Sequence, residues 1–434
     1  MRAWIVAYSF PPVGGAGVQR MLKLVKYLPE HGIEPRVLTV ANPSVPILDG
    51  SLEKDFPSGL EVVRARTFEP GYAAKKAAWS AEEKGKAPSL KSSVLKKASG
   101  LAKQLLVPDP QLLWQPTAQL AMARALLRDR PDVVLISGPP FSQFLLGPLV
   151  RLAPKTGLVL DYRDEWSTYR STYEMMGSQL QERVGATLES GLVRLAHVIT
   201  TATEEFRENL LREFPAMPLT KVKAIPNGYD RDDFPQVLPE PPEGHFVLTY
   251  AGTVFKLTSV RGFLQGVRLL HERSPELAKK LHVRFIGRVV ETELDSFEGT
   301  EALGVERIGY IEHSRVIPAL ASSHEVLCTL DDVPGVERIY PAKIFELMHL
   351  RRPILTLAPQ GALTRLVERH RLGTVIPPRD SQAIAMHLES TLRAFTRGEH
   401  ALSTRPVDVD RYDRRALAGE FAEWMREAAY RARA

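Results

Sequence analysis

The stretch that decides the fold is Trp4-Ile5-Val6-Ala7-Tyr8-Ser9-Phe10-Pro11-Pro12-Val13-Gly14-Gly15-Ala16-Gly17, an apolar run followed at once by a glycine turn. The run predicts a buried strand, and the turn leads into an amphipathic helix that continues to Leu28. Glycines permit positive φ and let backbone N–H groups approach a phosphate or a sugar, while a helix start favours negative charge. The turn lacks the Gly-x-Gly-x-x-Gly spacing of dinucleotide-binding proteins, so it predicts either a ligand contact or a plain strand-to-helix turn.

The same alternation of strand and helix continues along the chain, which is typical of parallel sheets built from βαβ units. In the first half, short runs rich in Val and Ile predict strands over 4–8, 35–40, 61–65, 132–137, 157–162, 197–201 and 221–225. In the second half, such runs lie at 246–251, 283–286, 307–311, 326–330, 353–357 and 373–376. We therefore expect an α/β protein with two Rossmann-like domains that bind ligands at the carboxyl ends of their strands.

Three prolines in Leu238-Pro239-Glu240-Pro241-Pro242-Glu243-Gly244 mark the boundary between the halves, because proline does not fit inside a helix or a central strand. The predicted parts are an N-terminal domain over 1–237, a linker over 238–245, a C-terminal domain over 246–408 and a last helix over 409–434. The last helix is expected to pack back on the N-terminal domain through apolar residues at helical spacing.

Cys328 is the only cysteine among 434 residues, which excludes an intramolecular disulfide and a cysteine metal cage and favours the cytoplasm. No apolar run approaches the roughly 20 residues that a membrane-spanning helix needs. These two observations predict a soluble protein.

The net charge of +6 is concentrated in one segment, because residues 75–103 hold eight lysines against Glu82 and Glu83. We interpret residues 66–107 as a lysine-rich helical insertion in the first domain. Such an excess of lysine predicts either contact with an anionic membrane or a solvated surface insertion. The segment 75–103 has Trp79 as its single aromatic residue, which argues against a nucleic-acid groove.

A second stretch with the properties of an anion site is Tyr340-Pro341-Ala342-Lys343-Ile344-Phe345-Glu346. Pro341 suits the first turn of a helix, and the free N–H groups after it predict a diphosphate site. Glu346 follows about one and a half turns later, where it can accept hydrogen bonds from two ribose hydroxyls. The alternative for Glu346 is a solvated helix carboxylate.

Taken together, four segments resemble the retaining glycosyltransferases of family 4, which have the GT-B fold. They are the glycine turn from Pro11 to Gly17, Ile225-Pro226-Asn227-Gly228-Tyr229-Asp230 with Phe234, Tyr250-Ala251-Gly252-Thr253, and the stretch from Tyr340 to Glu346. The resemblance implies two Rossmann-like domains that face each other across a cleft. It places the nucleotide-sugar on the second domain, the acceptor on the first, and the sugar against Gly14 and Gly15.

The resemblance also implies a basic residue after the first strand of the second domain, which neutralises the diphosphate as the leaving group departs. Arg261 matches that position, and Lys256 is a nearby substitute. The family has two glutamates separated by seven residues. If Glu346 is the second, the first position falls on Arg338, and Glu337 is one residue away. Either Glu337 reaches the sugar from a shifted loop, or the site recognises the sugar differently.

The expected catalytic residues are thus Arg261, Glu337 and Asp164. The expected donor-binding residues are Gly14, Gly15, Gly252, Thr253, Lys256, Arg261, Arg338, Tyr340, Pro341, Ala342, Lys343 and Glu346.

The expected acceptor contacts follow two strands of the first domain. Many family members carry a histidine near the loop Asp161-Tyr162-Arg163-Asp164, and this sequence has none there. The acceptor contact then falls to Asp161, Arg163 or Asp164, unless Arg163 forms an ion pair with one of the aspartates. Ser142, in the turn Gly138-Pro139-Pro140-Phe141-Ser142, is expected on the same side.

The implied reaction is retaining transfer of a hexose from a UDP- or GDP-sugar to a saccharide or lipid-linked acceptor, in cell-surface polysaccharide or glycoconjugate biosynthesis at the inner face of the membrane. No metal and no protein nucleophile are expected, since Arg261 and the helix start at Pro341 can hold the diphosphate. Asp230-Arg231-Asp232 has the spacing of a metal-binding triplet but precedes the linker, where a turn is expected. The alternatives are a nucleotide-sugar epimerase with the same two-domain plan and a catalytically silent nucleotide-sugar binding protein.

Overall fold

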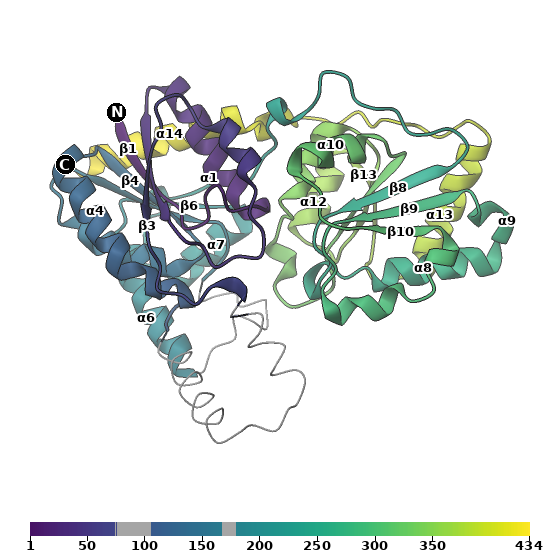
Figure 1. Cartoon of the computed structure of the whole chain (residues 1–434), viewed down its shortest axis with the longest axis horizontal. Helices are drawn as coiled ribbons and strands as arrows, with labels where there is room; N and C mark the ends of the chain where they lie inside the picture. Colours follow the sequence, from purple (N-terminus) through teal and green to yellow (C-terminus); the bar gives the residue numbers. More distant parts are fainter. Residues whose placement is uncertain (74, 76–105, 167–178) are drawn as a thin grey trace. The chain divides into compact units, whose positions relative to one another are not determined.

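The computed structural model describes residues 1–73, 75, 106–166 and 179–434, which form two compact units (Figure 1). The first unit combines Met1–Pro226 with Arg414–Ala434, and the second is Asn227–Asp413. The predicted linker 238–245 therefore lies inside the second unit, and the chain passes from one unit to the other at Pro226. Nearly all of the lysine-rich segment 75–103 lies outside the described residues, so its predicted helices and its membrane contact stay predictions.

The first unit is built on a seven-stranded sheet in the order β3-β2-β1-β4-β5-β6-β7. All of its strand pairs are parallel. The strands are β1 Arg2–Val6, β2 Glu34–Val40, β3 Glu61–Ala65, β4 Val133–Gly138, β5 Gly157–Tyr162, β6 Val198–Thr201 and β7 Val222–Ala224. The helices are α1 Ala16–Tyr27, α4 Gln115–Asp129, α5 Gly147–Arg151, α6 Gln179–Leu195, α7 Glu204–Glu213 and α14 Arg414–Arg431.

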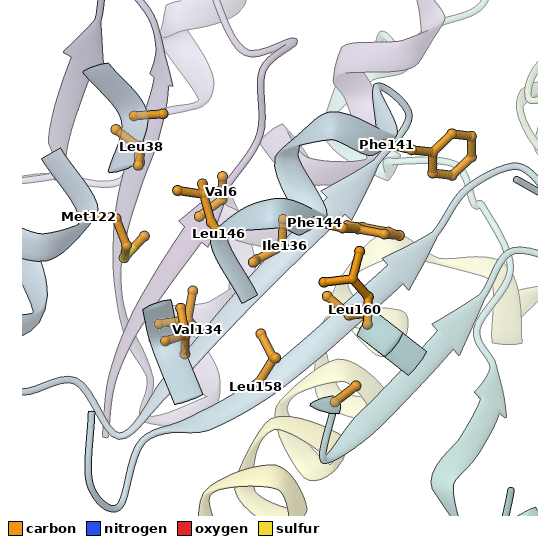
Figure 2. Close-up of a cluster of buried hydrophobic side chains, with 14 of the residues drawn as sticks. Val6, Leu38, Met122, Val134, Ile136, Phe141, Phe144, Leu146, Leu158 and Leu160 are labelled. Carbon is orange, nitrogen blue, oxygen red and sulfur yellow. The ribbon is translucent and has the colours of Figure 1, made fainter. Parts of the chain in front are cut away.

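Apolar clusters cover both faces of this sheet, which is why its central strands are continuous apolar runs and do not alternate with polar residues. On one face, side chains of β4 and β5 pack with Met122 of α4 and with Phe144 (Figure 2). On the other face, α1 and α14 cover the alternate residues of the same strands. Every residue of β4 and β5 is buried.

The second unit repeats this plan with a six-stranded parallel sheet in the order β10-β9-β8-β11-β12-β13. Its strands are β8 Phe246–Ala251, β9 Leu281–Ile286, β10 Val305–Ile308, β11 Glu325–Thr329, β12 Ile354–Leu357 and β13 Gly373–Ile376. Its helices are α8 Arg261–Arg273, α9 Pro275–Ala278, α10 His313–Ala321, α11 Lys343–Leu350, α12 Ala362–His370 and α13 Ser381–Thr396. The predicted pair of α/β domains with parallel sheets is confirmed, and β10 begins two residues before its expected position.

The last helix, α14, belongs to the first unit although it follows the second unit in sequence (Figure 1). Leu417 and Phe421 are buried in the cluster that α1 also covers. Gly157 lets α14 approach closely, since a Cβ there would lie 2.6 Å from the carbonyl carbon of Ala428. Within the described residues, none of the helices has the length and apolar character to cross a bilayer.

Candidate active site

Each sheet has a point where the strand order reverses, between β1 and β4 in the first unit and between β8 and β11 in the second. The connections that leave the two strands at such a point run to opposite faces of the sheet. A crevice therefore opens at the carboxyl ends of these strands, where open α/β sheets bind ligands. Most of the predicted site residues lie in the loops that follow these four strands, whereas Asp161, Arg163 and Asp164 lie at the end of β5.

In the second unit, the side chain of Lys343, the first residue of α11, reaches this point. Its Nζ donates a hydrogen bond to the carbonyl oxygen of Ala251 and lies 4.0 Å from the centroid of the Tyr250 ring. Both residues end β8. The charge of Lys343 also reaches β11, where burial raises the pKa of the Cys328 thiol to about 12 and Lys343 opposes that rise. The amine thus lies at the reversal between β8 and β11.

Lys343 has no carboxylate partner among the described residues, so its charge is offset only by a carbonyl and an aromatic face. It also stands at the amino end of α11, where the helix dipole adds positive potential. The amine occupies the space that a side chain at position 252 would take, because a Cβ at Gly252 would lie 1.9 Å from Nζ. Two sources of positive potential therefore meet at one strand end, an arrangement that favours an anion.

Arg261, the expected diphosphate cation, is arranged differently. It begins α8, and its guanidinium donates to Asp295 at 2.5 and 2.8 Å and to the carbonyl of Thr292 at 2.6 Å. Glu293 lies 3.4 Å from its Nε. The hydrogen bonds that Arg261 donates to Asp295 raise the pKa of Arg261 above its ordinary value. The charge of Arg261 is therefore balanced by two carboxylates, and its diphosphate contact stays a prediction.

Two glycines shape the strand end beside Lys343. Gly252 has φ +144° and Gly287 has φ +124°, both in the region that disfavours other residues. A Cβ at Gly287 would lie 2.4 Å from the carbonyl oxygen of Gly252, so the turns after β8 and β9 touch through their backbones. The carbonyl of Thr253 accepts from the Tyr250 hydroxyl at 2.9 Å, which fixes the next residue of the turn. Lys256 follows as an exposed residue.

The predicted glutamate loop lies against the start of α12. Glu337 pairs with its neighbour Arg338 at 3.0 Å, and a Cβ at Gly361 would lie 2.6 Å from the Cα of Glu337. Gly361 precedes the first residue of α12, so the loop backbone is held at that helix start. About half of the Glu337 side chain is exposed, which leaves it accessible to a ligand.

The start of α11 differs slightly from the expectation. The helix begins at Lys343 with Ala342 as its N-cap, and Pro341 therefore precedes it instead of occupying its first turn. The carbonyl of Pro341 accepts from the Ile344 N–H at 3.0 Å, which tightens the entry. Tyr340 and Glu346 are half-buried, and Glu346 falls in the first turn. Of the expected stretch from Tyr340 to Glu346, Lys343 is the residue whose side chain reaches the end of β8.

In the first unit, the glycine turn leads into α1 as expected. Gly15 has φ +97° and open space around it. Gly14 packs tightly, since a Cβ there would lie 2.8 Å from Cγ2 of Ile47. Arg163 donates hydrogen bonds to the carbonyls of Gly17 and Pro139, so it joins the turns that follow β1 and β4. The alternative for Arg163 was an ion pair with an aspartate, and the hydrogen bonds that its guanidinium makes are to these carbonyls instead.

Asp161 and Ser142 are placed at odds with their expected contact to an acceptor, because both are completely buried. The Asp161 carboxylate accepts from Arg20 at 2.8 and 3.1 Å, and the Ser142 N–H donates to Asp109 at 2.9 Å. Asp161 and Ser142 therefore hold the loops after β5 and β4 in place through buried contacts. Asp164, by contrast, is exposed just after β5, which leaves it and the half-buried Arg163 as the candidates that an acceptor could reach.

Sequence reasoning missed Arg20 and Glu69. Arg20 is buried on α1 and reaches Asp161, while Glu69 follows β3 and accepts from Tyr8, from Lys75 at 2.7 Å and from Gln111 at 3.2 Å. Burial, followed by the contact with Glu69, raises the pKa of the Tyr8 hydroxyl above its ordinary value. A charged residue inside the apolar face of α1 was a usable signal for Arg20, since buried charges are paired.

Comparisons with known proteins agree with this architecture. A family model described as a glycosyl transferase 4-like domain matches residues 14–228, and one described as glycosyl transferases group 1 matches residues 246–394. No curated protein matches the sequence.

Solved structures resemble the chain over nearly its whole length at low identity. Sucrose-phosphate synthase from Thermosynechococcus elongatus has a TM-score of 0.64 and 12% identity, with 98% of each chain covered. The Anabaena protein HepE, solved in complex with UDP and glucose, has a TM-score of 0.61 and 16% identity, with 98% of this chain and 99% of that one covered. A putative UDP-N-acetylglucosamine 2-epimerase from Listeria monocytogenes has a TM-score of 0.52 and 12% identity, with 97% and 94% covered. These likenesses establish a GT-B fold.

Proposed function

Because the chain belongs to the group 1 glycosyltransferases, with a glycosyl transferase 4-like domain ahead of the group 1 domain, we propose that it transfers a hexose from a nucleotide-diphosphate sugar to a saccharide or lipid-linked acceptor, with retention of the anomeric configuration. The second unit holds the donor and the first unit holds the acceptor. The observation that supports this most is the unneutralised amine of Lys343 at the strand-order reversal of the second sheet.

Lys343 supports a diphosphate better than Arg261 does. Arg261 would have to leave Asp295 and Glu293 before it could bind a phosphate, whereas Lys343 needs no such exchange. Negative charge grows on the leaving diphosphate in the transition state, so a fixed cation lowers the barrier as well as the dissociation constant. Lys343 is therefore the group that stabilises the leaving diphosphate, and Glu337 and Glu346 contact the sugar and the ribose.

Replacement of the two cations tests this assignment. UDP and GDP are compared with uridine and guanosine by titration calorimetry on the wild type, Lys343→Met and Arg261→Met. A charge-assisted hydrogen bond contributes about 1.5–3 kcal/mol, so Lys343→Met should weaken the matching diphosphate by roughly 10- to 150-fold and leave the nucleoside unchanged. Arg261→Met should change diphosphate binding less. If Lys343→Met keeps its affinity for the diphosphate while Arg261→Met loses it, Arg261 and not Lys343 binds the diphosphate.

UDP-sugars are the first donors to test, because HepE, which shares the fold, was solved with UDP and glucose. Proton NMR of the initial product measures retention, and activity after chelation of divalent ions measures the proposed independence from metal. In the proposed reaction no side chain forms a covalent intermediate, and the leaving phosphate helps to remove the acceptor proton. Inversion at the anomeric carbon would exclude the retaining mechanism.

The acceptor side is assigned to the exposed Asp164 of the first unit, while Gly14 and Gly15 of the same unit are kept as contacts of the donor's sugar. Asp164→Asn should lower transfer to the acceptor while leaving donor binding unchanged, because Asp164 lies in the other unit from Lys343. Release of free UDP or a 2-epimeric sugar without any acceptor would instead favour the epimerase, whose fold is also similar. The same proposal places the enzyme in the cytoplasm, where it takes part in the synthesis of cell-surface polysaccharide with residues 75–103 at the inner face of the membrane.

A further inference from the structure

A group of basic side chains lies at the amino edge of the first sheet, opposite the edge that carries the glycine turn. We call Arg151, His197, Lys221 and Arg431 the basic cluster. Arg151 contacts the His197 ring, and Arg431 donates to the carbonyl of His197 at 3.2 Å and to that of Thr220 at 3.0 Å. These contacts join the ends of α5 and α14 to the starts of β6 and β7.

The basic cluster is poorly neutralised. Among the described residues, the carboxylate paired with it is Glu427, 2.7 Å from Nε of Arg431, while Arg151 and Lys221 have none. Lys221 donates only to the carbonyl of Arg194, at 3.1 Å. Burial and then the charges of Arg431 and Arg151 lower the pKa of Lys221 to about 8. An anion placed against the cluster would relieve this repulsion.

Helix dipoles explain why some of the basic residues in the cluster lie where they do. Basic residues are favourable in the last turn of a helix, which accounts for Arg151 at the end of α5 and Arg431 at the end of α14. Lys221 lies instead in a short 3-10 turn before β7, where there is no such benefit. The cluster therefore holds more positive charge than the helices require.

Large apolar side chains are exposed beside the same residues. Leu152 is 80% exposed next to Arg151, Leu219 is 66% exposed two residues before Lys221, and Tyr430 is 69% exposed next to Arg431. Single exposed apolar residues are common on protein surfaces. Here, however, three exposed apolar residues neighbour basic residues that have few carboxylate partners. Such a combination favours binding to a lipid bilayer, because basic groups contact the lipid phosphates while leucine and tyrosine side chains enter the membrane interface.

We propose that the amino edge of the first sheet is a docking surface for an anionic lipid bilayer, with Arg151, Lys221 and Arg431 on the phosphates and Leu152, Leu219 and Tyr430 in the interface. The six residues of β5 separate this edge from Asp164 by about 20 Å. The proposal is independent of the transferase assignment and concerns a surface other than residues 75–103.

Vesicle flotation with phosphatidylcholine, alone or with phosphatidylglycerol, tests the surface. A basic residue near an anionic membrane contributes about 1 kcal/mol, or about fivefold in binding, so the Arg151→Gln/Lys221→Gln double variant should bind anionic vesicles about 25-fold less. Leu152→Ser/Leu219→Ser should also weaken binding, to neutral as well as anionic vesicles. Lys279→Gln, an exposed lysine of the second unit, serves as the matched charge control and should bind like the wild type.

Two further arms decide between sources of the anion. A chain with the lysines of residues 75–103 replaced by glutamine should still bind, and inorganic phosphate at millimolar concentration should not release it. If the glutamine chain loses binding while the Arg151→Gln/Lys221→Gln variant keeps it, the docking surface is wrong. If only the charge variant has an effect and phosphate competes, the cluster is a site for a free phosphate ion and the bilayer proposal fails. Acetylation of Lys221, read by mass spectrometry, should slow on anionic vesicles and stay unchanged with phosphate.

Discussion

The Arg20 guanidinium and the Asp161 carboxylate form a two-point ion pair inside the first unit, with Nη2 to Oδ1 at 2.8 Å and Nε to Oδ2 at 3.1 Å. Burial alone would raise the pKa of Asp161, but Arg20 and the hydroxyls of Thr200 and Ser137 outweigh it and hold the pKa below its ordinary value. Arg20 also donates to the carbonyls of Ile225 and Pro226, the last residues before the chain enters the second unit.

Loss of one partner of this pair should destabilise the first unit strongly. Asp161→Asn removes the carboxylate that the buried Arg20 contacts at two points, and breaking a buried pair costs about 3–5 kcal/mol in comparable proteins. We expect the urea midpoint of the first unit to fall accordingly. Lys279→Ala removes an exposed pair with Glu276 and should change the stability by less than about 1 kcal/mol. Equal effects of the two substitutions would contradict the structural role of Asp161.

The placement of Lys343 depends on Gly252, which allows a direct prediction. Gly252→Ala puts a Cβ 1.9 Å from Nζ of Lys343 and should displace the amine, so UDP should no longer raise the melting temperature. Gly299→Ala is the matched control, because Gly299 also has positive φ, +72°, but open space around it. Both variants lose stability from backbone strain, by roughly 1 kcal/mol or more. A UDP-induced shift in Gly252→Ala equal to that of the control would separate Gly252 from the donor site.

Acid should destabilise the second unit through His324. Burial, followed by the charges of His400 and Arg352, lowers the pKa of His324 to about 4, and its Nδ1 accepts from the Val247 N–H at 3.0 Å. The folded-state pKa lies below the ordinary 6.5, so this stabilisation is present above pH 6.5 and is lost as the pH falls toward 4. At pH 5 the loss is about 2 kcal/mol.

Urea unfolding between pH 7.5 and 5 measures this loss. His324→Gln should reduce the pH dependence, because glutamine accepts the same hydrogen bond without titrating, and His349, whose pKa burial also lowers to about 4, accounts for the remainder. His282→Gln, a half-exposed position, should leave the dependence as in the wild type. The explanation fails if the slope is unchanged in His324→Gln.

Cys328 provides a probe of the second unit. Its thiol is completely buried in β11 and burial raises its pKa to about 12, so it should react with a thiol reagent only after β11 opens. The labelling rate should rise with urea in step with unfolding of the second unit. Rapid labelling without urea would show that β11 opens locally in the native protein.

Much of the fold was predictable because a single physical pattern carries it. Strands buried on both faces of a parallel sheet are continuous apolar runs. The runs of β4 and β5 therefore indicate where these strands lie and that they pair in parallel. The boundary after Pro226 was not predictable from the prolines at 239–242, because the residues that close the first unit are held by Arg20 through backbone carbonyls. Every residue has a backbone carbonyl, so the sequence does not reveal which carbonyls a side chain will contact.

The candidate site shows the same division. The Tyr340–Glu346 stretch was found because a proline, a basic residue and an acid follow each other at helical spacing. The difference between Arg261 and Lys343 lies in long-range partners, since Asp295 is 34 residues from Arg261. Asp161 failed as an acceptor contact for the same reason, as its partner Arg20 lies 141 residues away in the sequence.

The return of α14 to the first unit has a consequence for synthesis on the ribosome. The second unit is in effect inserted between Pro226 and Arg414, and its two ends pair with each other through the hydrogen bond from the Tyr229 N–H to the Tyr412 carbonyl at 3.0 Å. Until the last helix emerges, the face of the first sheet that Leu417 and Phe421 cover stays exposed. The second unit can therefore complete its core before the first unit, which is synthesised earlier but lacks its last helix. A chain truncated before Arg414 should then depend on chaperones, whereas residues 227–413 should fold when expressed alone.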